Sequence, residues 1–159
     1  ADYYQMLWYT GASQTDAANL QSDNINWDQM RLVFRRQKTG EKCMLAIAGE
    51  FERFLETLPK QGLLFPHMAL LGSGQRATEF GRRRKLMEYE GISLHSYRYA
   101  WAERAAVAGM PIRWAQAALG HSSRLVATAY ARKAEIVCPL PEEYREDPVT
   151  LEGGRSAVA

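Results

Sequence analysis

One stretch near the front of the chain limits the possible folds more than any other. Residues 30–37 (MRLVFRRQ) and 42–47 (KCMLAI) both have the character of extended segments that end at turn residues. The four residues KTGE (38–41) separate them, and Gly40 can adopt the positive φ that a tight hairpin turn requires. We therefore predict an antiparallel β-hairpin over residues 30–47.

Helical periodicity dominates the rest of the chain. A first helix ends at Thr10-Gly11, and Ser13 begins a second one, because its hydroxyl can accept a hydrogen bond from a free amide of the first turn. Asp16 follows three positions later, as in a capping box. Further helices are predicted at 50–58, 75–90, 93–108 and 111–119, with a long connection at 60–74 and a last helix that contains Tyr130. The fold class is mainly α with a small antiparallel β-sheet (α+β).

The length of 159 residues favours one domain with a sizeable core. No apolar run approaches the roughly 20 residues of a membrane helix, so we expect a soluble protein without a membrane partner. Cys43 and Cys138 match neither a zinc nor a redox spacing, which favours free thiols in a reducing, cytoplasmic location. We expect one domain over residues 1–140 and an acidic, then small and polar tail over 141–159. Since the chain begins at Ala1, we expect an N-terminal domain to precede it.

Positive charge is concentrated in two places although the net charge is only +2. One run is RRRK, from Arg82 through Arg83 and Arg84 to Lys85; the other surrounds Arg35 and Arg36 in the predicted hairpin. Each run alone is typical of a solvated surface. Two such runs beside the motifs described next favour a nucleic-acid interface.

Candidate catalytic groups occur in short motifs. HSYR places His95 and Arg98 three positions apart, which puts them on one face of a helix. LGH ends at His121, and Tyr130 follows nine residues later. Lys38 lies in the hairpin turn QKTG. Each motif alone also suits an ordinary polar surface or a packed tyrosine, so only their combination indicates a catalytic site.

The order of these motifs resembles the catalytic domain of the tyrosine recombinases, the phage integrase family. The resemblance rests on TG with a following Asp and Leu, QKTG, HSxR, the segment AGMP, LGHSS and ATAY, over roughly residues 3–135. It implies cleavage of one DNA strand, a 3′-phosphotyrosine intermediate and rejoining to another strand, with no metal, nucleotide or other cofactor. It also implies an N-terminal DNA-binding domain before this chain.

The resemblance assigns a role to each motif residue. Tyr130 matches the nucleophile, Lys38 the hairpin lysine that protonates the leaving 5′ oxygen, and His121 the second histidine. His95 and Arg98 match the HxxR pair of the family, in which a planar guanidinium can bind two phosphate oxygens. Histidine can also move the proton of the tyrosine. Religation needs no ATP, because the phenol is a good leaving group.

One position departs from the family pattern. The segment after Thr-Gly carries the first catalytic arginine in the family, but this chain has Ser13 there, before Asp16, the acidic residue that braces the segment. Losing one preorganised donor costs about 10²–10³ in rate. The sequence leaves open whether strand transfer is slow, absent or rescued by another group. The candidates for rescue are Arg35, Arg36, Arg124 and the amide of Gln14.

Partners follow from the same resemblance. Double-stranded DNA is the expected partner, and family members assemble as tetramers on paired sites. The apolar segment 134–140 is available to dock on a neighbour, which leaves open a monomer or an exchange of this segment between copies. The alternative function is a DNA-binding module that keeps the fold without the reaction. A metal-dependent nuclease is disfavoured, because no cluster has metal-ligand spacing.

Overall fold

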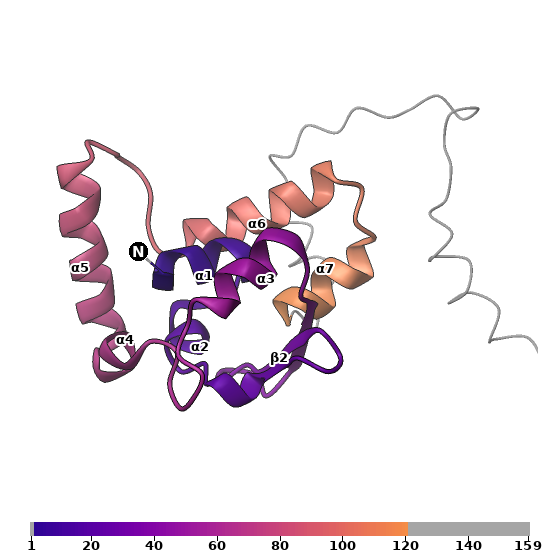
Figure 1. The fold of residues 1–159 in the computed structure, drawn as a ribbon. Coiled ribbons are helices and arrows are strands. Elements are labelled where there is room, and N and C mark those ends of the chain that lie inside the picture. The colour runs from indigo at the N-terminus through magenta and orange to yellow at the C-terminus, as the bar shows by residue number, and fades with distance from the viewer. Residues whose placement is uncertain (1, 121–159) are drawn as a thin grey trace, which may run out of the picture.

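The computed structural model describes residues 2–120 as a set of helices with a small sheet at one side of them (Figure 1). The fold class is therefore the one predicted, mainly α with a small antiparallel sheet. The elements are α1 (Asp2–Thr10), α2 (Gln14–Ala18), the 3₁₀ turn η1 (Ser22–Asn24), β1 (Ile25–Asn26), β2 (Arg31–Arg35), β3 (Lys42–Ala46), α3 (Gly49–Glu56), α4 (Pro66–Leu70), α5 (Ser73–Leu86), α6 (Ser96–Val107) and α7 (Ile112–Leu119).

The predicted hairpin is present. Strands β2 and β3 pair antiparallel with Phe34 opposite Cys43, and the buried side chains alternate along β2. Gly40 has φ of +72°, and its amide donates to the carbonyl of Arg36 at 2.8 Å, which closes the turn. Strand β1 adds to the outer edge of β2, so the order is β1-β2-β3. The sequence did not indicate β1, because two residues are too few to show a period.

The Thr10-Gly11 turn requires glycine for two reasons. Gly11 has φ of +60°, and its amide donates to the carbonyl of Leu7 at 2.9 Å, which ends α1. A Cβ at this position would lie 2.8 Å from Cδ2 of Leu119 and 2.9 Å from Cγ of Trp101. The end of α1 therefore packs directly against α6 and against the end of α7.

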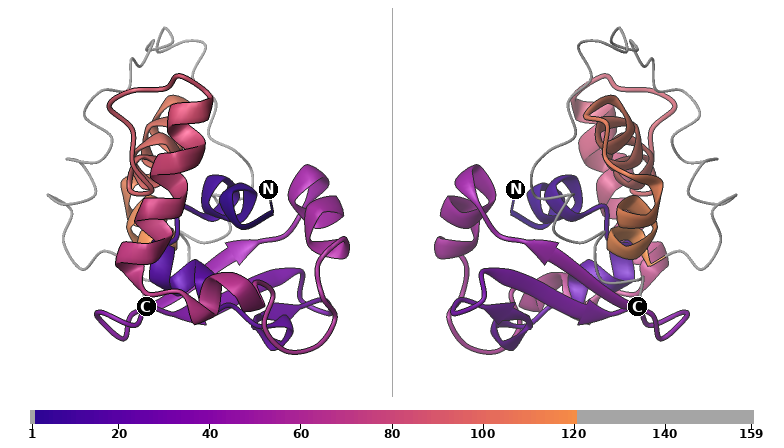
Figure 2. Two further views of the ribbon diagram at one scale, coloured as in Figure 1. Left: turned by 90° about the vertical axis from the view of Figure 1, so that its left-hand side faces the viewer. Right: turned by 90° about the vertical axis from the view of Figure 1, so that its right-hand side faces the viewer.

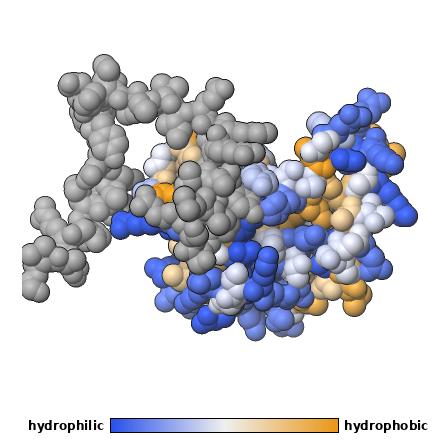
Figure 3. Space-filling view, turned by 180° about the vertical axis from the view of Figure 1, so that it is seen from behind, coloured by the Kyte–Doolittle hydropathy of each residue, from blue (hydrophilic) through white to orange (hydrophobic). Residues whose placement is uncertain are grey.

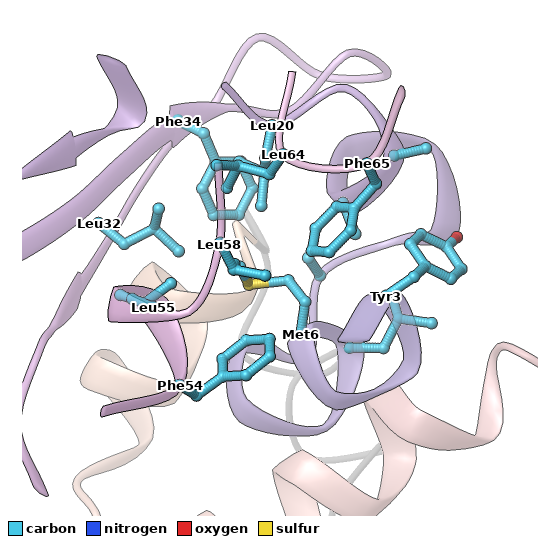
Figure 4. Packing of buried hydrophobic residues seen from close by; sticks show 14 of the residues in the cluster. Tyr3, Met6, Leu20, Leu32, Phe34, Phe54, Leu55, Leu58, Leu64 and Phe65 are labelled. Atoms are coloured by element: carbon cyan, nitrogen blue, oxygen red, sulfur yellow. The ribbon is translucent and has the colours of Figure 1, made fainter. Parts of the chain in front are cut away.

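Two groups of buried side chains hold the elements together. The larger group joins α1, α2, the sheet and α3, with Met6 and Leu55 fully buried (Figure 4). The smaller joins α6 to α7 around Trp101, whose indole donates to the carbonyl of Tyr9 at 2.9 Å. Leu45 packs against both groups. Figure 2 shows α1 between α3 on one side and α6 and α7 on the other, so α1 is the common support of both halves.

Helix α5 lies at the edge of the molecule (Figures 1 and 2). The connection predicted at 60–74 contains the short helix α4, which begins at Pro66, a residue suited to the first helical position. Sequence periodicity could not reveal a helix of five residues. Of the helices between residues 2 and 120, none combines the length and the apolar character needed to cross a bilayer.

Candidate active site

Ser13 forms the cap that the sequence predicted for α2. Its backbone is extended (φ −67°, ψ 156°), and its Oγ accepts a hydrogen bond from the amide of Asp16 at 3.1 Å. The same hydroxyl donates to Oδ2 of Asp16 at 2.7 Å. A serine hydroxyl has a single hydrogen, and here this hydrogen is directed to the carboxylate.

The Asp16 carboxylate connects α2 to the hairpin. Its Oδ1 accepts from the backbone amide of Gln37 at 2.9 Å, and Oδ2 lies 3.6 Å from Nε of Arg36. The residue is only 6% exposed, so these partners replace its water. Lys38 directly follows Gln37 and is exposed in the turn. The carboxylate therefore fixes the base of the turn that carries Lys38 relative to Ser13.

Arg98 lies at the junction of three helices. It is 3% exposed; its Nη1 donates to the carbonyl of Gly11 at 2.7 Å, and its Nη2 donates to the carbonyl of Leu119. His95 occupies the N-cap position of α6 with helical dihedrals (φ −71°, ψ −22°), so the helical spacing extends back to it. His95 and Arg98 consequently line one cavity of about 190 Å³, together with Leu94 and residues 12–15.

The charges around this cavity affect two neighbouring groups. The pKa of His95 is lowered by partial burial first, and then by the positive charges of Arg98 and Arg36. The neutral imidazole, which can accept a proton, is thereby favoured. Burial raises the pKa of the Cys43 thiol to about 11, although the guanidinium groups of Arg36 and Arg98 act in the opposite direction. Cys43 is a buried free thiol.

Arg36 and Arg98 together hold the end of α7. Arg36 donates from Nη1 to the carbonyl of Gly120 at 2.9 Å, next to the Leu119 carbonyl that Arg98 binds. Gly120 has φ of +59°, and a Cβ there would lie 2.3 Å from Cδ of Arg36. Glycine thus allows the Arg36 side chain to pass directly over the backbone. Leu119 and Gly120, whose carbonyls the two arginines bind, are the last two residues before His121.

Comparison with known proteins identifies the family. The pattern of the phage integrase family matches residues 3–135. The chain belongs to the phage integrase family. No curated protein sequence matches it at a significant level.

Solved structures share the fold of this integrase-family chain. The catalytic domain of bacteriophage HP1 integrase is 21% identical, with a TM-score of 0.64 over 82% of this chain and 73% of that one. A lambda integrase dimer bound to a COC′ core site is 19% identical, with a TM-score of 0.69 over 87% and 54%. XerA recombinase is 18% identical, with a TM-score of 0.64 over 81% and 52%. The integrase-family chain thus spans about half the length of the last two chains.

The described residues contain only part of the predicted integrase site. His95, Arg98, Ser13 and Asp16 lie in one region, and Asp16 ties the Lys38 turn to it. Other predicted groups, His121, Arg124 and Tyr130, lie outside the described residues.

The two hairpin arginines predicted to bind DNA differ in their surroundings. Arg35 is exposed, and its Nη1 donates to the carbonyl of Gly40 at 3.1 Å. Arg36 points to the protein instead, where Asp16 and Gly120 are its partners and its side chain is 13% exposed. Arg36 directly follows the last residue of β2, and successive side chains along a strand face opposite sides, which accounts for this difference.

The basic run on α5 is also divided. Arg82, Arg83 and Lys85 are exposed, and Arg83 also donates to Glu79 at 2.8 Å and lies over the ring of Tyr4. Arg84 donates to the carbonyl of Ile92 at 3.2 Å. Figure 3 shows that the side formed by α5, at the right, carries mostly hydrophilic residues. Arg83 and Arg84 are therefore held by contacts with Glu79 and Ile92, and Arg82 and Lys85 are the other exposed members of this run.

Sequence reasoning missed Arg76. This residue of α5 is 4% exposed and donates to the carbonyls of Met68 and Leu71, to Oγ1 of Thr15 and to Oε1 of Gln14. It fixes α5 and the loop before it to the first turn of α2. No local signal marks it, because an arginine in a polar helix is usually exposed. Among residues 2–120, no group of three or more His, Cys, Asp or Glu side chains could hold a metal ion.

Proposed function

We propose that this chain is the catalytic domain of a site-specific recombinase that cleaves and rejoins DNA through a 3′-phosphotyrosine. The supporting observation is that His95, Arg98 and residues 12–15 line one cavity, and that the adjacent Asp16 binds both Ser13 and the turn that carries Lys38. These groups come from three segments that are distant in the sequence: the start of α2, the hairpin turn and the start of α6. Their convergence is what a reaction at one phosphate requires.

The reaction divides among these residues as follows. The phenolic oxygen of Tyr130 bonds to phosphorus while the bond to the 5′ oxygen breaks. His95, neutral because of its lowered pKa, accepts the phenolic proton. Lys38 donates a proton to the leaving 5′ oxygen, and Arg98 neutralises charge on the non-bridging oxygens. A 5′-hydroxyl of another strand reverses the step, and His121 completes the site.

We extend the proposal to the domain plan and the assembly. Residues 1–140 form the catalytic domain, residues 141–159 form its tail, and a DNA-binding domain precedes the chain. A lambda integrase dimer of the same fold is bound to a COC′ core site, which supports double-stranded DNA as the partner here. The working assembly is a tetramer on paired sites, with segment 134–140 docked on a neighbour.

The test is a covalent-adduct assay with nicked duplexes, in which cleavage releases a short strand that diffuses away. A pool with randomised core sequences removes the need to know the target. We expect adducts that survive denaturing gels, that form in EDTA and that disappear in Tyr130→Phe. Absence of adducts from both the wild type and Ser13→Arg would refute catalysis.

A second candidate function is a DNA-binding module without strand transfer. The observation that favours it is the Ser13 hydroxyl, which is committed to Asp16 rather than available for a phosphate. This function predicts salt-dependent duplex binding in which Arg82→Gln/Lys85→Gln reduces the slope of log affinity against log salt by about 2. An unchanged slope would exclude α5 as the DNA footprint.

A further inference from the structure

The position of the missing arginine raises a specific question. The family pattern implies two arginines that bind the phosphate. Arg98 matches one of them, but Ser13 occupies the position of the other. The Ser13 hydroxyl donates its single hydrogen to Oδ2 of Asp16 at 2.7 Å, and while it does so it cannot donate to a phosphate. Another side chain must supply the second charge if the site binds a phosphate dianion in its transition state.

Two neighbouring groups do not meet this requirement. Gln14 lines the cavity, but it is neutral, and its Oε1 accepts from Nε of Arg76 at 3.3 Å. Arg35 is charged, but it is exposed and donates to the carbonyl of Gly40 at the end of the turn. Neither places a positive charge beside Asp16.

Arg36 does so. Its Nε lies 3.6 Å from Oδ2 of Asp16, which is the same oxygen that the Ser13 hydroxyl contacts. Position 13 and the Arg36 guanidinium therefore adjoin one carboxylate atom. The charge also acts at the cavity, since the pKa of His95 is lowered by burial, then by Arg98 and then by Arg36.

The Arg36 guanidinium also keeps donors for a ligand. A guanidinium carries five N–H groups, and Nη1 uses one on the carbonyl of Gly120. Its Nε is buried and faces Asp16 in the ion pair, so the donors that a ligand could use are those on Nη1 and Nη2. Arg36 and Arg98 together carry one more charge than Asp16 can neutralise, which suits an incoming phosphate.

We propose that Arg36 supplies the second cation of the phosphate clamp, in place of the arginine that is absent at position 13. This inference rests on the proposed strand-cleavage function and assigns that function a residue. In this chain, the guanidinium beside Asp16 would come from the hairpin, whereas the family pattern places it at the start of α2.

The test is a double-mutant cycle of Arg36→Gln and Ser13→Arg, measured as the rate of adduct formation at saturating DNA. Arg36→Gln should reduce the rate by about 10²–10³-fold, as loss of a preorganised donor does. In the Arg36→Gln background, adding Ser13→Arg should raise the rate at least about tenfold. In the wild-type background, Ser13→Arg should change the rate by less than about threefold. Arg53→Gln, which removes an exposed charge on α3, is the matched control and should leave the rate unchanged.

A second measurement separates a catalytic role of Arg36 from a purely structural role. A methylphosphonate at the cleaved position removes one oxygen charge from the substrate, so the defect of Arg36→Gln should shrink on it if Arg36 neutralises that charge. A purely structural defect would be equal on both substrates. Arg36→Lys keeps the charge and should retain more activity than Arg36→Gln, and thermal denaturation verifies that each variant is folded.

Each outcome decides the inference. If Ser13→Arg has the same effect in both backgrounds, or if the defect is unchanged on methylphosphonate, Arg36 is not the clamp, although the strand-cleavage function stands. If neither the wild type nor Ser13→Arg forms an adduct, the proposed function fails and the inference fails with it. Rescue confined to the Arg36→Gln background supports the relocated charge.

Discussion

Asp16 is the residue whose replacement should most affect the architecture of the site. Its 6% exposed carboxylate accepts hydrogen bonds from Ser13 and from the Gln37 amide, and lies beside the Arg36 guanidinium. Asp16→Ala leaves an arginine without its counter-charge, which typically costs about 3–5 kcal/mol. Asp16→Asn keeps the shape but loses charge-assisted bonds, at about 1.5–3 kcal/mol.

Urea denaturation at neutral pH measures these losses in the free energy of unfolding. Asp28→Ala is the control, because Asp28 is exposed, and it should change that free energy by less than about 0.5 kcal/mol. Hydrogen exchange adds a local measurement: the Gln37 amide should lose protection in both Asp16 variants, because its acceptor is altered or gone.

Two results would refute this reasoning about Asp16. A loss below about 1 kcal/mol in Asp16→Ala would mean that the ion pair and its hydrogen bonds contribute little to the fold. Unchanged protection of Gln37 would mean that the carboxylate does not hold the base of the hairpin turn.

Three further predictions concern other contacts. Gly120→Ala and Gly62→Ala should each lower the free energy of unfolding by about 1–2 kcal/mol, because both positions have a positive φ. In thermal denaturation Gly120→Ala should lose about 1–3 kcal/mol more, because its Cβ would overlap Arg36, whereas no atom of residues 2–120, apart from the chain neighbours, lies within 4 Å of a Cβ at Gly62. The pKa of His95 is lowered from its ordinary value of 6.5, so the stability contributed by the neutral imidazole is complete above pH 6.5 and is lost as the pH falls below it. On acidification, the free energy of unfolding of the wild type should therefore fall more than that of His95→Asn, as measured by urea denaturation. Arg76→Met should cost at least about 2 kcal/mol in the same assay, since it strands two buried carbonyls.

The sequence predicted those elements that carry their own local signal. The hairpin follows from two extended segments around Gly40, and the Ser13 cap follows from its spacing to Asp16. Strand β1 and helix α4 were missed, because two and five residues are too short for a periodic pattern. Their formation depends on neighbours already in place, which only the tertiary structure supplies.

The site was predictable in its segments but less so in its contacts. The motif order placed His95, Arg98 and Asp16 in one family site, and the structure brings their segments together. The alternation of the buried Leu32 and Phe34 places Arg35 and Arg36 on opposite sides of the hairpin. Nothing in RRQK indicates that Arg36 contacts Asp16 and Gly120, because these partners are distant in the sequence.

The cap at the start of α2 has a consequence for how this sequence can change. Returning an arginine to position 13 would remove the hydrogen bonds of Ser13 to Asp16 and bring a second guanidinium to a carboxylate that Arg36 already faces. The reversal is therefore unfavourable while Arg36 remains, and losing Arg36 is unfavourable while Ser13 remains. We therefore expect the two positions to be epistatic, and a relative that carries arginine at 13 to carry a different residue at 36.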